Sequence, residues 1–312
     1  MGDTARLSGP ALRRLDLQGV AREGVRRKRL AVSVPWLTVP MLVFLALMVA
    51  FPLAYAVWLS LTDFRFGEAA GFIGLRNYRT MLNDAQFWNG LRVTVLLYIL
   101  SLALQIVAGT YLGMLLARLR RARRLLQTIL MSPFLLPPVV VGMMWLVILD
   151  PSLGAANWVL RSLGLPPSNW LASPQWVVPV LAVLDTWQWT PFVGLLVLGG
   201  LQTMPDGVAD AASIDGAHGV SMLRHVTLPL LMPTLLVAVI LRSVDLLRFF
   251  DLVYITTQGG PGTASQSLNV YAFRRGLEFF DMGYASALML TLSALVLGVV
   301  LTLSRFRRTV AW

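Results

Sequence analysis

The stretch ADAASIDGAHGVSMLRHVTLPLLMP, residues 209–233, is a polar segment between long hydrophobic runs. It contains three formal charges and both histidines of the chain. The alanines at its start favour a helix, and Gly216 is well placed to end that helix in a left-handed conformation. A second short helix is expected from about Val220 to Val226, because a residue that precedes a proline leaves the α region. The segment therefore predicts a helix–glycine–helix element outside the hydrophobic runs.

The hydrophobic runs on both sides of this segment indicate a membrane protein. Hydrophobic residues make up 57% and charged residues 13% of the 312 residues, whereas a soluble domain carries about 25% charged residues. An α-helix needs about 20 apolar residues to cross the hydrocarbon core of a bilayer. Six runs are long enough, although the fourth and fifth carry charges: 30–62, 93–117, 125–149, 177–203, 230–257 and 282–304. The expected fold class is an all-α integral membrane protein with six transmembrane helices.

The net charge of +11 is distributed in a way that predicts topology. Eight basic residues precede the first run, five lie within 118–124, and three follow the last run. The loops of opposite parity are close to neutral. Cytoplasmic loops of membrane proteins carry an excess of Lys and Arg, so both termini are expected in the cytoplasm. This distribution does not favour the other explanation of a basic chain, which is binding to nucleic acid.

Several functional classes are disfavoured by what the sequence lacks. A phosphate-binding loop of the form G-x-x-x-x-G-K-[ST] requires a lysine, and the only lysine is Lys28, in the basic tail. His218 and His225 have neither the H-E-x-x-H spacing nor a carboxylate at a ligand-like offset. The chain has no cysteine and hence no disulfide. We expect a chain that is not an enzyme and that binds no cofactor or metal of its own.

The polar segment resembles a known motif. Residues 210–229 read D-A-A-x3-G-x9-V-x-L-P, which is similar to the E-A-A-x3-G-x9-I-x-L-P motif in the membrane subunits of binding-protein-dependent ABC importers, with Asp for Glu and Val for Ile. In that family the segment is the coupling helix region, which sits in a cleft of a separate ATPase subunit. The resemblance assigns this contact to Asp210, Ala211, Ala212, Asp215, Gly216, Leu228 and Pro229. From local physics alone, a simple connector between two spans is an equal alternative.

Three longer stretches are similar to the maltose-type carbohydrate permeases: FIGLRNYRTMLNDAQFWNGLRVT, LDTWQWTPFVGLLVLGGLQTMP and LRSVDLLRFFDLVYITTQGGP. The resemblance implies a type I ABC importer permease fold in a bacterial or archaeal cytoplasmic membrane. The expected order is a basic cytoplasmic tail over 1–34, a first transmembrane helix over 35–62, an external loop over 63–92, a permease core over 93–304 with the coupling segment at 204–229, and a cytoplasmic end over 305–312.

The same resemblance implies the partners and the transported solute. The partners are a second homologous permease, two ATPase subunits that use ATP and Mg, an external substrate-binding protein and the membrane lipid. The solute is expected to be a sugar, either a di- or an oligosaccharide. Glycerol phosphate or another polyol ester is the alternative within transport. A membrane-embedded enzyme or assembly factor without ATPase partners is the competing class.

The substrate pathway is predicted from ionisable residues inside the spans, which normally face a bundle interior or water. Helical spacing places one carboxylate, one guanidinium and several rings on two helix faces. Hydroxyls of a polyol would bond to the charged groups, and its C–H faces would rest on the rings; in the maltose-type permeases, residues at these motif positions line the sugar site. The candidates are Asp185, Trp189 and Phe192 in the fourth span, and Arg242, Asp245, Leu246 and Phe249 in the fifth.

Two structural alternatives remain for these residues. Charges of alternating sign recur every three residues at Arg242, Asp245, Arg248 and Asp251, which permits a ladder of salt bridges along the helix. The aromatic residues are also suited to plain packing between helices. If the pathway interpretation holds, Asp185 and Arg242 are expected to face each other across a water-filled cavity.

Overall fold

The structure is a computed structural model that describes residues 38–119, 123–205 and 207–310. The expected basic tail at 1–34, residue 206 of the coupling segment and the last two residues lie outside this part of the chain. The chain forms two compact units, residues 1–52 and 53–312. Helix α1 (Thr38–Ser60) crosses the boundary between them, and all other described helices belong to the second unit.

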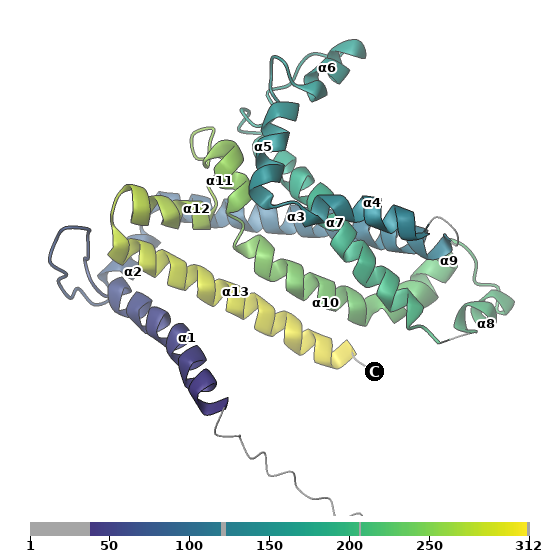
Figure 1. The fold of residues 1–312 in the computed structure, drawn as a ribbon, viewed down its shortest axis with the longest axis horizontal. Coiled ribbons are helices and arrows are strands. Elements are labelled where there is room, and N and C mark those ends of the chain that lie inside the picture. Colours follow the sequence, from purple (N-terminus) through teal and green to yellow (C-terminus); the bar gives the residue numbers. More distant parts are fainter. Residues whose placement is uncertain (1–37, 120–122, 206, 311–312) are drawn as a thin grey trace, which may run out of the picture. The chain divides into compact units, whose positions relative to one another are not determined.

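The described residues form helices and contain no β-strand (Figure 1). Five helices are long and apolar enough to cross a membrane: α1, α3 (Ala85–Arg118), α7 (Val177–Gln202), the continuous helix Val220–Leu247, and α13 (Met282–Val310). The expected third span is a bent pair, α4 (Arg123–Leu135) and α5 (Pro138–Ile148), whose axes differ by 92°. Counting this pair as one span gives the six that the sequence predicts.

Shorter elements connect these helices. They are α2 (Arg76–Leu82), α6 (Ala155–Ser162), α8 (Val208–Ile214), α9 (Val220–Met222), α11 (Asp251–Thr257) and α12 (Leu268–Phe273), with π-helical turns at Leu223–Thr227 and Arg274–Glu278. Helix α10 (Leu228–Leu247) continues α9 without a break and lies between α3 and α13 (Figure 1). The segment 63–92 was expected to be a loop, but it contains α2 and the first turns of α3.

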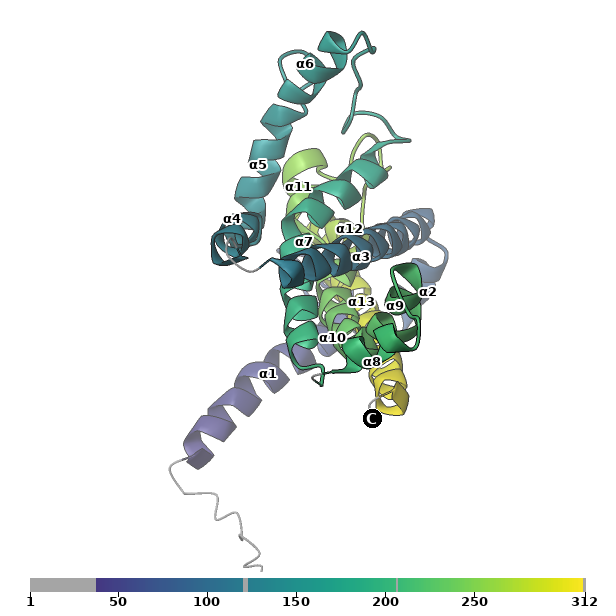
Figure 2. The same cartoon turned by 90° about the vertical axis from the view of Figure 1, so that its right-hand side faces the viewer.

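Two glycines determine how closely α3 and α7 approach. These helices cross each other (Figure 2) and form the most extensive helix pair in the described chain. A Cβ atom on Gly109 would lie 2.5 Å from the Cβ of Val193, and one on Gly113 would lie 2.7 Å from the backbone oxygen of Gly194. Small residues spaced four apart let helix backbones touch in a membrane, where packing rather than water drives association.

The bend between α4 and α5 has a local cause, and a side chain from another helix satisfies the backbone carbonyl that it exposes. Pro137 and Pro138 follow each other, and a proline removes a backbone donor and pushes the preceding residue out of the α region. The break leaves the carbonyl of Leu136 without a helical partner, and Gln188 of α7 donates to it at 3.0 Å. Irregular backbone at membrane depth is tolerated where neighbouring protein groups satisfy it in this way.

Helix α10 also ends earlier than the fifth hydrophobic run predicts. The run extends to residue 257, but the helix stops at Leu247 and a new helix, α11, begins at Asp251. The carbonyl of Arg248 accepts a hydrogen bond from Asn269 at 2.8 Å, and the carbonyl of Phe249 accepts one from Ser267 at 3.1 Å. These bonds come from the start of α12, where Ser267 is the cap residue and Asn269 lies in the first turn, and hydropathy alone does not place α12 there.

A polar cluster joins the starts of α3 and α13 to α12. The carboxylate of Asp84 caps α3 by accepting from the backbone of Gln86 at 2.9 Å, and it also accepts from the hydroxyls of Tyr271 and, at 2.6 Å, Tyr284. Burial by itself raises the pKa of Asp84, but these three hydrogen bonds and the nearby charge of Arg275 outweigh it, so the pKa lies below its usual value. The carboxylate is therefore held ionised.

The glycine contact yields a test of the α3–α7 packing. Gly113→Val should greatly reduce the amount of folded protein recovered from membranes, because its side chain would collide with backbone that cannot move aside. Gly199→Ala in α7 is the matched control, since a Cβ atom there meets nothing within 4 Å, and alanine is the better helix former by about 1 kcal/mol. Yield and thermal stability in detergent measure both effects, and equal behaviour of the two variants would contradict the packing argument.

Candidate functional site

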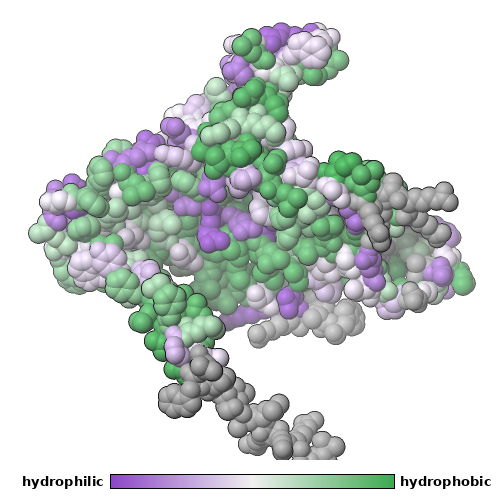
Figure 3. Space-filling model, in the orientation of Figure 1, coloured by the Kyte–Doolittle hydropathy of each residue, from purple (hydrophilic) through white to green (hydrophobic). Residues whose placement is uncertain are grey.

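A cavity of about 410 Å³ opens beside the break between α10 and α11. Figure 3 shows hydrophilic residues gathered in the middle of an otherwise largely hydrophobic face, in the region between these two helices. The residues that line the cavity are charged, amide or aromatic with few exceptions. They are Pro138, Asp185, Gln188, Trp189, Arg242, Asp245, Arg248, Phe249, Phe250, Asp251, Leu252, Asn269 and Met289.

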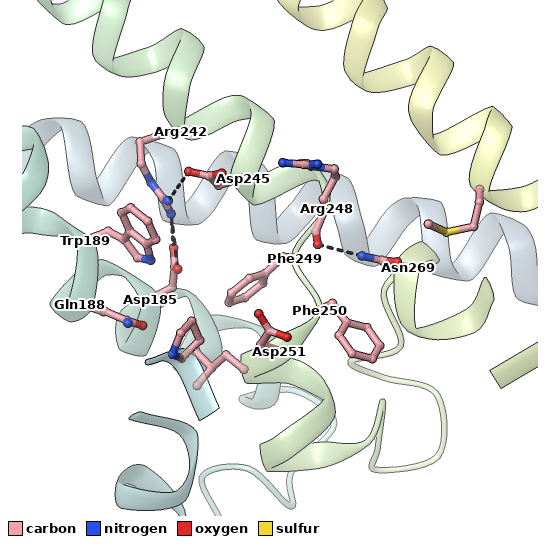
Figure 4. A pocket seen from close by; sticks show the side chains of 13 residues that line it. Asp185, Gln188, Trp189, Arg242, Asp245, Arg248, Phe249, Phe250, Asp251 and Asn269 are labelled. Carbon is pink, nitrogen blue, oxygen red and sulfur yellow. Dashed lines mark hydrogen bonds and ion pairs between the residues drawn. The ribbon is translucent and has the colours of Figure 1, made fainter. Parts of the chain in front are cut away.

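Arg242 forms one wall of this cavity and is almost fully enclosed by protein, with 1% of its surface exposed. Its guanidinium donates to Asp185 at 3.1 Å and to Asp245 at 3.3 Å (Figure 4). The same group lies over the indole of Trp189, with its central carbon 3.9 Å from the ring centroid. An isolated charge buried away from water is very costly, so these contacts are what permit Arg242 to occupy this position.

A third helix contributes to the same network through Gln105 of α3. Its side-chain oxygen accepts from Nε of Arg242 at 2.8 Å, and its side-chain nitrogen donates to the carboxylate of Asp185. Gln105, Asp185 and Arg242 are all buried. The network therefore joins α3, α7 and α10 through charge-assisted hydrogen bonds, which are stronger than bonds between neutral groups.

The structure brings together most of the residues that the sequence assigned to the pathway. Five of them line the cavity: Asp185, Trp189, Arg242, Asp245 and Phe249. Phe192 does not, because its ring stacks on Phe134 with centroids 5.5 Å apart. Leu246 is buried in the helix packing and is also absent from the cavity wall. Whether the five residues contact a substrate stays a prediction.

One expectation about the charged residues is wrong, and the alternative of a salt-bridge ladder holds only in part. Asp185 and Arg242 do not face each other across water, because they form a direct buried ion pair. The ladder along the fifth span has a single rung, Arg242 to Asp245. It stops there because the helix ends at Leu247, and Arg248 instead donates to the carbonyl of Val244 at 3.1 Å.

Several residues that lie at the site in the structure were not predicted from the sequence. Gln105 is the only amide in the second hydrophobic run, 93–117, and this polar group in an apolar span was the available signal. Arg248 and Asp251 were interpreted as parts of a ladder, and they line the cavity instead. Gln188, Phe250 and Asn269 were not singled out, since their position depends on the breaks between α4 and α5 and between α10 and α11.

The polar segment forms two helices separated by a glycine, as the sequence predicts. Helix α8 ends at Ile214, and Gly216, which follows the cap residue Asp215, has a φ of +83°. The N–H groups of Gly216 and Ala217 donate to the carbonyls of Ser213 and Ala212, which is the hydrogen-bond pattern of a Schellman helix end. Asp210, Ala211, Asp215 and Pro229 are exposed, whereas Ala212 and Leu228 are half-buried.

The end of the second helix was predicted incorrectly. It was expected to stop before Leu228 and Pro229, but α9 runs through a π-helical turn at Leu223–Thr227 into α10. In that turn the N–H of Leu228 donates to the carbonyl of Leu223. The wider turn accommodates the missing donor of Pro229 without ending the helix, as π-bulges do.

Comparison with known proteins identifies the family. Residues 105–308, which contain both the cavity wall and the polar segment, match the family described as "Binding-protein-dependent transport system inner membrane component". The chain belongs to this family. The permease is therefore a multi-pass protein of the inner membrane and a component of a binding-protein-dependent ABC transport system, not an enzyme.

Curated relatives cover nearly the whole permease. It is 37% identical to the trehalose/maltose transport system permease protein MalF of Thermococcus litoralis, over 86% of this chain and 92% of the relative. It is 33% identical to the sulfoquinovosyl glycerol transport system permease protein SmoG of Agrobacterium fabrum, over 88% and 89%. It is 29% identical to the sn-glycerol-3-phosphate transport system permease protein UgpA of Rhizobium meliloti, over 88% and 93%.

Solved structures show the same fold. A chain of a bacterial alginate ABC transporter, in complex with an alginate pentasaccharide-bound periplasmic protein, superposes with a TM-score of 0.77, covering 88% of the permease and 93% of that chain at 22% identity. A chain of the MetNI methionine ABC transporter gives a TM-score of 0.53 at 19% identity, covering 72% and 95%. The type I ABC importer permease fold expected from the sequence is confirmed.

Proposed function

We propose that the permease imports a neutral di- or oligosaccharide through the cavity beside Arg242. The observation that carries this proposal is the combination of hydrogen-bonding groups and aromatic rings on one wall. Asp245, Asp251 and Asn269 supply acceptors and donors for hydroxyl groups, and Trp189 and Phe249 supply apolar faces. The cavity volume of about 410 Å³ falls within the roughly 300–1,000 Å³ of typical small-molecule sites.

The charges of the cavity favour a neutral solute over glycerol phosphate or another polyol ester. Three aspartates and two arginines line it, so its wall has a formal charge of −1. Arg242 is already bound to two carboxylates, which leaves Arg248 as the only lining cation without a carboxylate partner among the described residues. A phosphate could bind at Arg248 without displacing an aspartate, but Asp245 and Asp251 line the same cavity and would repel it.

The named relatives support a sugar but not a particular one. Relatives at 37% and 30% identity are named for trehalose or maltose transport, and one at 33% for sulfoquinovosyl glycerol. The glycerol-phosphate relatives are 29% and 28% identical. Because sulfoquinovosyl glycerol carries a sulfonate, these names support a sugar and do not decide between a neutral and an anionic one.

The permease would act within a larger assembly. We propose that it pairs with a second homologous permease, that a binding protein delivers the sugar from outside, and that two ATPase subunits supply ATP and Mg chemistry that this chain lacks. The coupling segment supports the ATPase contact, because it exposes 85% of the surface of Ile214, a large apolar side chain that lies outside the helices long enough to cross a membrane. Both termini and the coupling segment would then be cytoplasmic.

The substrate proposal is tested by uptake into liposomes that contain the complete transporter. Labelled maltose or trehalose should be imported with ATP, and sn-glycerol 3-phosphate should not. Trp189→Ala should reduce sugar uptake roughly threefold to tenfold, which corresponds to about 1 kcal/mol for one aromatic contact. Trp187→Ala is the matched control, because this residue is on the same helix, contacts Trp145 and does not line the cavity. Import of glycerol phosphate alone would refute the neutral-sugar proposal.

The coupling proposal is tested at Gly216, where a Cβ atom would meet nothing within 4 Å but φ is +83°. Valine is strained at this angle, whereas asparagine tolerates it. Gly216→Val should abolish most uptake and loosen the attached ATPase, while Gly216→Asn should stay near the wild type. Mass spectrometry of the complex purified in mild detergent reports the attached subunits. Wild-type uptake by both variants would show that the segment is only a connector.

The orientation proposal is tested by labelling, because the natural chain has no cysteine. Thr263 and Ser221 are both exposed but lie at opposite ends of the helix Val220–Leu247 and the segment that follows it. Thr263→Cys should react in intact cells with a thiol reagent that does not cross membranes, and Ser221→Cys should react only after the cells are opened. The reverse pattern would invert the proposed topology.

A further inference from the structure

The side chain of Gln105 is completely buried, with 0% of its surface exposed, and it does not line the cavity. It nevertheless bonds to both members of the ion pair that forms the cavity wall. It also lies on α3, whereas the predicted pathway residues lie on α7 and α10 or directly after α10. Gln105 is thus able to influence the cavity only through Asp185 and Arg242.

The chemistry of the three groups explains why an amide occupies this position. An ionised carboxylate only accepts hydrogen bonds and a guanidinium only donates them, whereas a side-chain amide does both. Gln105 therefore satisfies one bond of each charge at once. A glutamate there would place a second negative charge beside Asp185, and a leucine would leave each buried charge without one partner.

We propose that Gln105 is a positioning residue for transport, which fixes the guanidinium of Arg242 against Asp185 and across the indole of Trp189. The guanidinium covers one face of that indole at 3.9 Å, so its orientation determines how the ring is presented to the cavity. This inference rests on the proposed sugar pathway, in which Trp189 contacts the solute. Helix α3 has no residue in the cavity wall, and the inference gives it a part in solute binding through Gln105.

The test exchanges the amide and the acid. Gln105→Glu and Asp185→Asn each disturb the network when made singly, because one adds a buried negative charge and the other removes one. In the double variant, the carboxylate introduced at position 105 accepts from Arg242, and the amide introduced at position 185 donates to that carboxylate. The same kinds of bonds and the same net charge then return with the two groups interchanged.

Gln105→Leu removes all hydrogen bonding at similar size. Ser101→Ala is the control, since Ser101 is equally buried on α3 but its hydroxyl has no hydrogen-bond partner within the described part of the chain.

Two measurements are made on the complete transporter, and the first does not depend on knowing the solute. Thermal unfolding of the purified complex should show that the double variant is more stable than the sum of the two single effects predicts, which is the signature of direct coupling. The second measurement is maltose or trehalose transported per ATP hydrolysed. Gln105→Leu and Gln105→Glu should lower this ratio, because a misplaced guanidinium weakens solute binding while the ATPase subunits still hydrolyse ATP. The double variant should recover most of it, and Ser101→Ala should be unchanged.

The outcomes separate this inference from the proposed function. If the wild-type complex carries neither disaccharide but the unfolding temperatures still show coupling, the proposed solute is wrong and the positioning of Arg242 by Gln105 stands. Additive unfolding effects would overturn the inference. It would also be overturned if transport, ATP hydrolysis and yield of complex fell together in Gln105→Leu, because Gln105 would then serve only to stabilise the fold.

Discussion

The burial of Arg242 is the constraint on which this part of the bundle depends. A guanidinium cannot lose its charge under ordinary conditions, so a helix that carries one inside a membrane must bring compensating groups around it. Here they come from three helices: Gln105 from α3, Asp185 and Trp189 from α7, and Asp245 from α10 itself. The directional bonds of this network leave little freedom in how these helices rotate about their own axes.

The helix breaks and the buried charge belong to one arrangement. α4 and α5 separate at the prolines, and α10 and α11 separate after Leu247, so two hydrophobic runs are interrupted near the cavity. Each interruption frees backbone carbonyls, and side chains of neighbouring segments, Gln188, Asn269 and Ser267, donate to them. Polar side chains in this region therefore serve two purposes. Some donate hydrogen bonds to backbone carbonyls at the helix breaks, and others bind the charged guanidinium of Arg242. Discontinuous helices of this kind are common where a transporter lines its binding site.

The sequence was sufficient for the features that depend on local pattern. Hydrophobic length predicted the long helices, and a glycine after alanines that favour a helix predicted the helix end beside Gly216, whose φ is +83°. The family motif covers residues whose spacing is fixed within one segment. Asp185, Trp189 and Arg242 were found because charges and rings in a membrane span are informative on their own.

Features that depend on partners far away in the chain were not accessible in this way. Hydropathy counts Leu136–Pro138 as part of one run, because it registers apolar side chains and not missing backbone donors. The direct contact of Asp185 with Arg242 joins residues 57 positions apart, and no periodicity reports such a pair. Gln105 carries no charge, so only its hydrogen bonds to Arg242 and Asp185 in the structure indicate its role.

The continuous helix Val220–Leu247 connects the polar segment, which we propose couples to the ATPase, to the cavity. Its 28 residues correspond to about 42 Å at 1.5 Å per residue, and Arg242 lies near its far end. A displacement of the coupling segment along this axis would reach Arg242 with little loss, because the helix has no break between them. Arg242 is bound to α3 and α7, and those two helices are in backbone contact at Gly113 and Gly194. Movement of α10 alone would break the buried network, so the least costly response is for α3, α7 and α10 to move as one body.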